Sequence, residues 1–300
     1  MSRAGQEQPL SYKKHVDTAY LRELHLPLPT VTVLTGATGG IGGEVARRLA
    51  AEGHVLVLPG RSRERSEGLC RELRASSGNP HVYWVSCDLA SLESVRRAAD
   101  EIDAALPRID VLINNAGIFG GGREIIDGFE RHLLVNYLSP FLLTHRLLPK
   151  LEQARGRIVN VAGETARFGT LRLDDLNRSR RFSVLGAYAQ TKLALICFAR
   201  TLAEQLEGRG VDVVSLTPGI AGTDHLASAP RWLAWLWRKM PGPERAGAAV
   251  VRRVLDPRRR SGAYFLGSLP MIAPSGARRR HVRDALYAKS AELVGLEQPL

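Results

Sequence analysis

The sequence has few cysteines and no long apolar run. Its three cysteines, Cys70, Cys87 and Cys197, are widely spaced and give neither a disulfide framework nor the spacing of metal ligands. No apolar stretch reaches the roughly 18 to 20 residues that cross a bilayer, and the polar first 17 residues lack the apolar region of a signal peptide. We therefore expect a soluble cytoplasmic protein with no metal site and no transmembrane segment.

Acidic residues are fewer than basic ones, 30 against 42, which leaves a formal charge of +12. An excess of this size is typical of proteins that bind nucleic acids or membranes. The arginine runs at 258–260 and 278–280, however, flank Pro257 and Gly276 in loop-like sequence and contain no interleaved aromatic residues. We interpret them as solvated surface and expect no nucleic-acid partner. The same positive charge would also attract an anionic cofactor or an acidic substrate.

The pattern of apolar residues predicts one α/β domain. Three hundred residues with 44% hydrophobic content suffice for one sizeable core. Short aliphatic runs alternate with stretches of helical spacing, which is typical of a parallel sheet covered by helices on both faces. We predict a doubly wound, mostly parallel sheet of seven strands at 31–34, 55–58, 82–85, 111–113, 158–161, 211–216 and 264–266. The predicted helices span 41–52, 62–75, 92–105, 129–152 and 188–207.

Two motifs point to chemistry. A glycine-rich run from Thr35 to Gly42 follows the first predicted strand, where the backbone of such a turn can approach a pyrophosphate at the start of a helix. Tyr188 and Lys192 lie four residues apart in a predicted helix, and therefore on one face of it. There the ammonium would favour the phenolate and lower the tyrosine pKa, which makes the tyrosine an acid and base near neutral pH.

Together with Asn114 to Gly117 and Asn136, these motifs closely resemble those of the short-chain dehydrogenase/reductase family. The chain is most similar to the retinol-dehydrogenase-like branch at Asp127 to Glu130, at Asn136 to Thr144 and at Pro218-Gly219 followed by Thr223. The resemblance runs from about residue 31 to residue 267. It implies the Rossmann fold, a nicotinamide cofactor and a homodimer or homotetramer.

The resemblance also implies a division of the chain and a substrate lid. We expect an N-terminal arm at 1–30, the Rossmann-type domain at 31–270 with a small lid at about 225–244, and a C-terminal extension at 271–300. Three interpretations of the lid's Trp232, Trp235 and Trp237 stay open. They line a large apolar pocket, or they anchor a surface helix to the core, or they belong to an amphipathic helix that contacts a membrane. The third is suggested by the flanking Arg231, Arg238 and Lys239.

The resemblance assigns the cofactor-binding residues. The glycine-rich turn contributes Gly36, Gly40, Ile41 and Gly42, with Thr38 placed to reach phosphate oxygens. Asp88 and Leu89 correspond to the adenine-contacting pair, and Asn115, Ala116 and Gly117 pass beneath the adenine ribose. Pro218, Gly219 and Ile220 bring backbone groups to the nicotinamide carboxamide, with Thr223 nearby, and Tyr188 and Lys192 complete the set.

The end of the second predicted strand indicates which nucleotide is used. A carboxylate there would accept hydrogen bonds from the ribose 2′-hydroxyl of NAD, whereas a basic side chain accommodates the 2′-phosphate of NADP. The sequence reads Gly60-Arg61-Ser62 and has no carboxylate until Glu64. Arg61 and Ser62 therefore favour NADP(H) over NAD.

By resemblance, Tyr188 gives a proton to a carbonyl or takes one from an alcohol, Lys192 holds the nicotinamide ribose, and Asn136 anchors a water on the proton path. A simpler role for Asn136 is a hydrogen bond to backbone. The family's serine, about 25 positions before the tyrosine, falls on Gly163, since 188 minus 163 is 25. Loss of one such donor typically costs about 100- to 1,000-fold in rate. Three alternatives for the missing donor stay open. The donor is the Thr165 hydroxyl, or it is a substrate group or an ordered water, or the serine has no effective replacement.

These observations predict an NADP(H)-dependent ketoreductase or dehydrogenase for a lipophilic small molecule, such as a polyketide, terpenoid, steroid or retinoid-like compound. The missing serine keeps a non-redox enzyme open, namely a cyclase, dehydratase or isomerase with Tyr188 as acid and base. A third interpretation is an NADP-binding regulatory protein. Peripheral contact with a membrane is compatible with all three.

Overall fold

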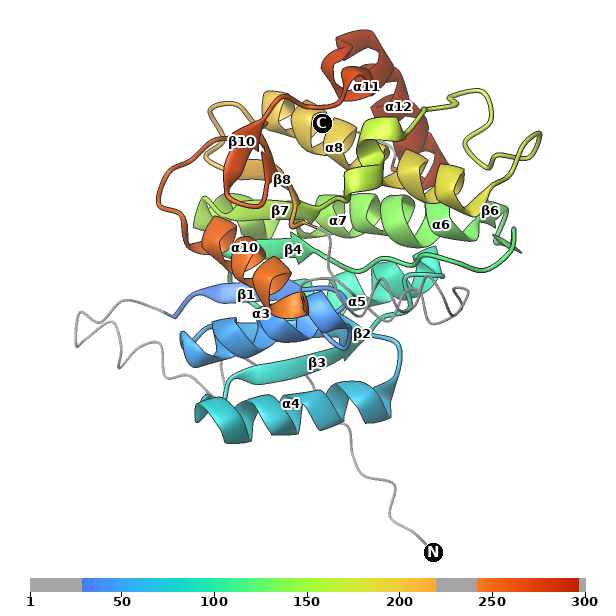
Figure 1. The fold of residues 1–300 in the computed structure, drawn as a ribbon. Helices are drawn as coiled ribbons and strands as arrows, with labels where there is room; N and C mark the ends of the chain where they lie inside the picture. Colours follow the sequence, from blue (N-terminus) through green and yellow to red (C-terminus); the bar gives the residue numbers. More distant parts are fainter. Residues whose placement is uncertain (1–28, 220–241, 297–300) are drawn as a thin grey trace, which may run out of the picture.

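The fold is built around a sheet of eight strands, shown in the computed structural model, which describes residues 29–219 and 242–296 (Figure 1). The strand order is β10-β9-β8-β7-β4-β1-β2-β3. Every neighbouring pair is parallel except β9 and β10. The strands are β1 (Val31–Leu34), β2 (Val55–Gly60), β3 (Val82–Ser86), β4 (Val111–Asn114), β7 (Arg157–Val161), β8 (Asp212–Thr217), β9 (Tyr264–Leu266) and β10 (Leu269–Met271).

All seven predicted strands form in doubly wound order, which confirms the predicted fold class. The sequence did not indicate β10, whose three residues include Pro270. It pairs with β9 across the two-residue turn Gly267-Ser268, where Gly267 has a φ of 56° that favours glycine. A separate hairpin, β5 (Ile125–Ile126) and β6 (Phe129–Glu130), lies outside the main sheet.

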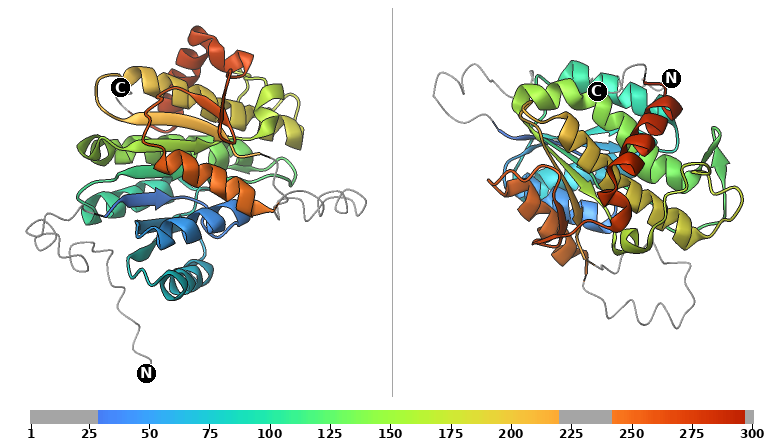
Figure 2. Two further views of the ribbon diagram at one scale, coloured as in Figure 1. Left: turned by 60° about the vertical axis from the view of Figure 1, so that its left-hand side comes forward. Right: turned by 90° about the horizontal axis from the view of Figure 1, so that it is seen from above.

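Helices cover both faces of the sheet (Figures 1 and 2). One face carries α3 (Gly40–Ala51), α4 (Arg63–Ser77) and α10 (Pro243–Leu255), and the other carries α5 (Leu92–Ala105), α7 (Ser139–Ala154) and α8 (Val184–Gln205). Successive strand residues alternate between the two cores, as the pleat requires. Val55 and Val57 of β2 pack in one core, and Leu56 and Leu58 pack in the other. Burial of both faces explains the continuous apolar runs in the sequence.

Shorter elements complete the chain. They are α6 (Arg131–Leu133), the π-helical turn η1 (Leu134–Leu138), the 3-10 helix η2 (Glu164–Phe168), α11 (Ser275–Arg278) and α12 (Arg280–Leu293). Helix α12 packs on α8, and polar contacts tie it to η1 and to α7. The Tyr137 hydroxyl lies 2.8 Å from Ser290 Oγ, and His145 Nε2 lies 2.6 Å from the Tyr287 hydroxyl. The division into arm, lid and extension stays a prediction, because most of the arm and of the lid lies outside the described residues.

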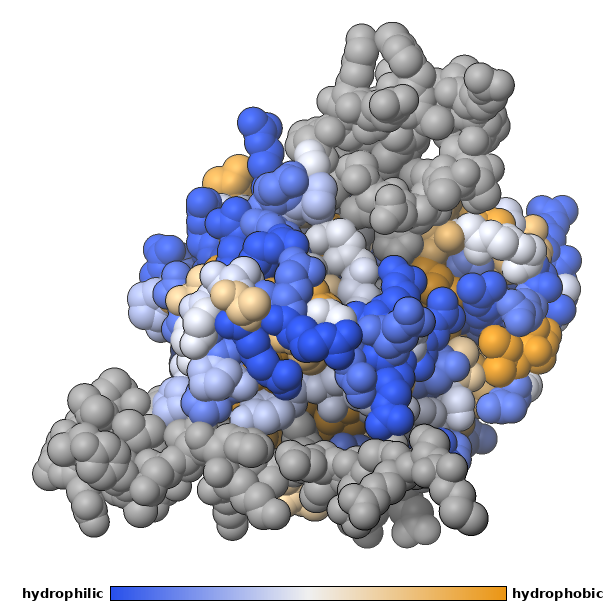
Figure 3. All heavy atoms as spheres, turned by 90° about the horizontal axis from the view of Figure 1, so that it is seen from below, coloured by the Kyte–Doolittle hydropathy of each residue, from blue (hydrophilic) through white to orange (hydrophobic). Residues whose placement is uncertain are grey.

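The end of the molecule at α4 is hydrophilic over most of its described surface (Figure 3). Helix α4 carries both signs of charge, and Arg63 donates to Glu67 at 3.1 Å within it. Arg47 of α3 lies 3.8 Å from Glu72 of α4, so the two helices also share a weak ion pair. Among the described residues, no helix combines the length and the apolar character needed to cross a membrane.

Candidate active site

The candidate site lies at the carboxyl edge of the parallel strands, beside β1 and β4. There the chain order reverses, with β2 and β3 on one side of β1 and β7 and β8 on the other side of β4. Such a reversal opens a crevice for ligands in doubly wound folds. The predicted cofactor residues follow strand ends along this edge: Gly36 after β1, Arg61 after β2, Asp88 after β3, Asn115 after β4 and Pro218 after β8. The fold therefore brings together residues that are far apart in sequence.

The glycine-rich turn is packed directly on the segment that follows β4. Thr35 Oγ1 accepts hydrogen bonds from the backbone N–H groups of Asn115 and Ala116, both at 3.1 Å. Gly36 has a φ of +73°, and a Cβ on it would lie 2.8 Å from Ala116 Cα. A Cβ on Gly42 would lie 2.1 Å from the Gly36 carbonyl oxygen. Both positions therefore require glycine. Thr35 was not among the predicted site residues, although a threonine directly after a buried strand, at the start of the glycine-rich turn, is a usable signal.

The start of α3 is open to a ligand. Its N-cap residue is Gly39, which offers no side-chain cap, and its first turn contains no acidic residue. By contrast, serine side chains accept backbone N–H groups at the starts of α4, α5 and α8. The first N–H groups of α3 and the positive end of its dipole are thus left for an external anion. Thr38 is exposed just before this turn. These features fit a pyrophosphate, as the sequence predicted.

The residues predicted to contact the adenosine side of the cofactor follow β2 and β3, and their role stays a prediction. Arg61 follows β2 directly, its side chain is exposed, and among the described residues it forms no ion pair. Ser62 is the N-cap of α4 and accepts from the Arg65 N–H at 3.4 Å, so its hydroxyl already has a local role. Asp88 Oδ1 accepts from the Ala90 N–H at 2.9 Å in the turn before α5. The Leu89 carbonyl accepts from Ser139 Oγ at 2.7 Å.

Tyr188 and Lys192 share one face of α8, as predicted from their spacing. Lys192 Nζ donates to the Val161 carbonyl at 3.0 Å and lies 5.5 Å from the centre of the Tyr188 ring. A Cβ on Gly117 would lie 3.1 Å from Nζ, so glycine leaves room for the lysine at this point. The ring of Phe119 meets the Tyr188 ring edge-on, with centroids 5.0 Å apart. The sequence pattern does not indicate Phe119 or the Val161 carbonyl, because both contacts depend on tertiary packing.

Burial sets the protonation states of this pair. It raises the pKa of Tyr188 to about 12 and lowers the pKa of Lys192 to about 8. The sequence-based expectation that Lys192 would lower the tyrosine pKa is therefore not met by the protein's own groups. The ammonium lies beside the ring and donates to a carbonyl, and desolvation of the phenolate outweighs its attraction. At neutral pH Tyr188 thus keeps its proton.

Asn136 lies in the π-helical turn η1 and is fully buried. Its Oδ1 accepts from the Ile118 N–H at 2.7 Å, and its Nδ2 donates to the Ile118 carbonyl at 3.0 Å and to Thr191 Oγ1 at 3.3 Å. The side chain therefore holds the segment after β4 against α8, as in the simpler role considered from sequence. The predicted role with water stays a prediction. π-Turns inside helices are frequent at functional sites, and the sequence pattern did not reveal this one.

Gly163 and Thr165 follow β7 and lie close to the tyrosine. A Cβ on Gly163 would lie 3.5 Å from the Tyr188 hydroxyl and 3.8 Å from Thr165 Oγ1. Thr165 is in η2, and its hydroxyl oxygen is buried without a hydrogen-bond partner among the described residues. Pro218 and Gly219 directly follow β8 at the same edge of the sheet. Ile220, Thr223 and the three lid tryptophans lie outside the described residues.

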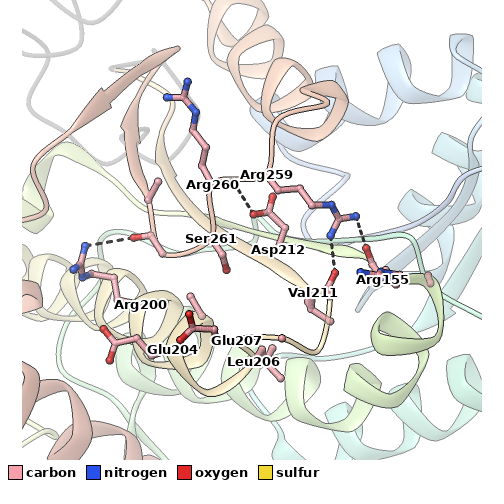
Figure 4. A pocket seen from close by; sticks show the side chains of 16 residues that line it. Arg155, Arg200, Glu204, Leu206, Glu207, Val211, Asp212, Arg259, Arg260 and Ser261 are labelled. Carbon is pink, nitrogen blue, oxygen red and sulfur yellow. Dashed lines mark hydrogen bonds between the residues drawn. The ribbon is translucent and has the colours of Figure 1, made fainter.

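A cavity of about 1000 Å³ lies at the opposite, amino edge of the sheet, between the ends of α7 and α8 and the loop before β9 (Figure 4). Several of its charged groups have protein partners. Arg259 donates to the Gly210 carbonyl at 2.6 Å and to the Arg155 carbonyl, and Asp212 accepts from Arg157 at 2.6 Å. Part of the basic run at 258–260 thus braces the fold. We place the active site at the carboxyl edge instead.

Comparisons with known proteins show which family this chain resembles. A family model described as short chain dehydrogenase matches residues 30–234. Human retinol dehydrogenase 13 is 37% identical over 291 residues, which cover 91% of this chain and 87% of that protein. Mouse polyprenol dehydrogenase is 38% identical over 281 residues, with 88% and 84% covered. The structure of a blue fluorescent protein from a metagenomic library, in complex with NADPH, matches with a TM-score of 0.65 at 27% identity, covering 79% of this chain and 95% of that chain.

Proposed function

Because this chain belongs to the short-chain dehydrogenase family, we propose that it is an NADP(H)-dependent oxidoreductase that interconverts a carbonyl and an alcohol on a bulky apolar substrate. The observation that carries the proposal is the pair of half-buried Tyr188 and buried Lys192 on α8, together with the uncapped start of α3. Tyr188 holds a proton that it can donate, and the start of α3 suits the pyrophosphate of a dinucleotide. Both lie at one edge of one sheet.

The residues present fit a nicotinamide dinucleotide. The glycine-rich turn would hold the pyrophosphate with the N–H groups of α3, and Gly117 leaves space beside Lys192 for the ribose. When bound, the reduced nicotinamide supplies a hydride to the carbonyl carbon. Pro218 and Gly219, with the expected Ile220 and Thr223, would orient its carboxamide.

Tyr188 delivers the proton in this proposal. With its pKa raised to about 12, the phenol is neutral at pH 7, and a neutral phenol is the form that donates to a carbonyl oxygen. A hydrogen bond to the Val161 carbonyl holds Lys192 in position. Asn136 accepts from the Ile118 N–H and so holds the segment that follows β4. The neutral phenol is thus the form that reduction requires. In oxidation the same atoms would move the proton back.

The direct test follows NADPH consumption with retinal and with a polyprenal as probes, which are the aldehydes of the alcohols named in two relatives. We expect turnover by the wild-type protein. Tyr188→Phe removes only the hydroxyl, so we expect a loss of at least about 100-fold in kcat with NADPH binding retained. Equal rates for the two proteins would refute Tyr188 as the acid.

The choice of NADP(H) over NAD rests on Arg61, which is exposed at the end of β2 with no carboxylate beside it in sequence. The NADPH complex of the metagenomic protein supports it by similarity. We expect Arg61→Asp to reverse the preference, raising KM for NADPH and lowering it for NADH, while Arg65→Asp in the helix α4 that follows serves as the matched control. An unchanged preference in Arg61→Asp would exclude this assignment.

A lipophilic substrate is supported by the relatives' names and by apolar side chains near the site. Phe168 and Leu185 are 86% and 59% exposed, and each lies three residues from Thr165 or Tyr188 in sequence. The cytoplasmic location, the peripheral membrane contact and the homodimer or homotetramer stay predictions. Cell fractionation and light scattering would test them.

A second candidate function is favoured by Gly163, which leaves the site without a serine hydroxyl. In a cyclase, dehydratase or isomerase, Tyr188 would move protons without net hydride transfer. Product formed with no change in NADPH absorbance would support this alternative. One NADP⁺ per product would exclude it, and would equally exclude a purely regulatory NADP-binding protein.

A further inference from the structure

The Thr165 hydroxyl lacks a partner where one is expected. Its oxygen is buried and forms no hydrogen bond among the described residues, although the residue is held in η2 by a bond from the Ala166 N–H to the Gly163 carbonyl at 3.0 Å. Leaving a buried polar group unsatisfied typically costs about 1–3 kcal/mol. A buried polar group without a partner therefore needs an explanation. A ligand that accepts a hydrogen bond from the Thr165 hydroxyl would provide one.

The neighbouring atoms indicate where that ligand lies. Both the Tyr188 hydroxyl, at 3.5 Å, and Thr165 Oγ1, at 3.8 Å, face the point where a Cβ of residue 163 would stand. The third contact of this point is Lys192 Cγ at 3.6 Å. Two hydroxyls from different elements, η2 and α8, therefore border one small space that the absent side chain of Gly163 leaves open.

The backbone does not require glycine at this position. Gly163 has φ −163° and ψ 159°, an extended conformation that any residue adopts. A Cβ there would also meet its neighbours at ordinary contact distances. What glycine contributes is thus the missing side chain, in contrast with Gly36 and Gly42, where close backbone contacts forbid a Cβ.

We propose that Thr165 is a catalytic residue that donates the second hydrogen bond to the substrate oxygen, and that Gly163 is the positioning residue that leaves room for this oxygen between the two hydroxyls. A carbonyl oxygen has two lone pairs, so it can accept from Tyr188 and Thr165 together. This inference rests on the proposed function and deepens it. It also chooses among the three replacements for serine that the sequence leaves open.

The step balances without a further reactant. The carbonyl carbon gains a hydride from the reduced nicotinamide, the C=O π pair moves to oxygen, and the oxygen takes the Tyr188 proton. Thr165 keeps its own proton and stabilises the charge that develops on oxygen. A threonine hydroxyl suits this role, because it donates a hydrogen bond without being an acid that competes with the phenol.

The experiment uses the full chain, NADPH and retinal, with Thr165→Val as the isosteric variant. We expect kcat to fall about 100- to 1,000-fold, as for other single oxyanion donors, while NADPH binding measured by fluorescence and the Tm stay within error. Thr165→Ser, which retains a hydroxyl, should remain within a few-fold of wild type. A Thr165→Val protein with wild-type kcat would overturn the proposal.

Gly163 provides the decisive second arm. Gly163→Ala fills the space without adding a donor and should lower kcat. Gly163→Ser fills the same space but brings its own hydroxyl, so its hydroxyl should replace that of Thr165 as the donor and make Thr165 dispensable. In the Gly163→Ser background we therefore expect Thr165→Val to cost less than about 5-fold, so that the double-mutant cycle shows strong coupling. Equal costs in both backgrounds would show that Thr165 acts only on the fold, against the proposal.

Tyr188→Phe separates this inference from the proposed function. If Tyr188→Phe abolishes turnover and Thr165→Val does not, the proposed function stands and the role of Thr165 is refuted. If the wild-type protein consumes no NADPH with any carbonyl probe, both are refuted. If both single variants lose turnover while binding NADPH, both are supported.

Discussion

At the scale of single residues, the candidate active site contains half-buried Tyr188 and buried Lys192, and their pKa values move in opposite directions. Tyr188 is held neutral by burial, and Lys192 is held close to losing its charge. The four-residue spacing predicts their proximity but not these directions, because spacing carries no information on how much water each group loses. The sign of a pKa shift is decided by depth in the fold, and Lys192 is only 3% exposed.

This burial has a measurable cost for Lys192. The unfolded chain binds a proton at this lysine up to about pH 10.5, whereas the folded chain loses it above a pKa of about 8. Between these values the unfolded state holds more protons, so the free energy of unfolding rises with pH, by on the order of 3 kcal/mol from this group alone. We expect Lys192→Met to reduce this rise between pH 8 and pH 10, measured by urea denaturation. Identical pH slopes for the two proteins would contradict a depressed pKa.

At the scale of elements, an arginine fastens β7 to the connection between α10 and β9. Arg157 begins β7, and its guanidinium donates to Asp212 Oδ2 at 2.6 Å and to the carbonyls of Arg253 at 2.6 Å and Asp256 at 2.7 Å. Both charged side chains of the pair are almost fully buried. This network lies at the amino edge of the sheet, at the far end of β7 from Gly163. The sequence pattern marks β7 as a strand and does not indicate the network, because one acceptor is the side chain of Asp212, 55 residues away, and the others are backbone carbonyls 96 to 99 residues away.

We expect Arg157→Met to lower the free energy of unfolding by about 3–5 kcal/mol, because it leaves Asp212 and several carbonyls buried without their donor. Arg209→Met is the matched control, since Arg209 pairs with Glu152 at 2.6 Å with its side chain 42% exposed. An exposed pair contributes only about 0–1 kcal/mol. Equal chemical-denaturation midpoints for the two variants would contradict the role given to Arg157.

At the scale of the whole molecule, the sequence predicts the parts that repeat a simple rule. Buried parallel strands leave continuous apolar runs such as 31–34, and their carboxyl ends must share one edge, so the glycine-rich turn, Arg61 and Asn115 could be placed together in advance. Features that depend on contacts between distant segments could not be predicted. They include the strand β10, the π-turn at Asn136 and the hydroxyl of Thr165, which has no hydrogen-bond partner in the described part of the chain.

The packing of helix α12 could not be predicted from the sequence either, because it depends on contacts with distant segments, and it can be tested by truncation. Its apolar face, with Leu286, Tyr287 and Ala291, is buried in the core that also contains Phe141 and Phe198 of α7 and α8. A chain ending at Arg279 would expose these aromatic rings and leave Tyr137 and His145 without their partners. We expect it to lose its cooperative thermal transition in circular dichroism, because the lost burial amounts to several kcal/mol against a typical stability of about 5–15 kcal/mol. A chain ending at Leu296 keeps every described contact and should melt like the full protein. A cooperative, unshifted transition in the shorter chain would instead mark 280–300 as a dispensable extension.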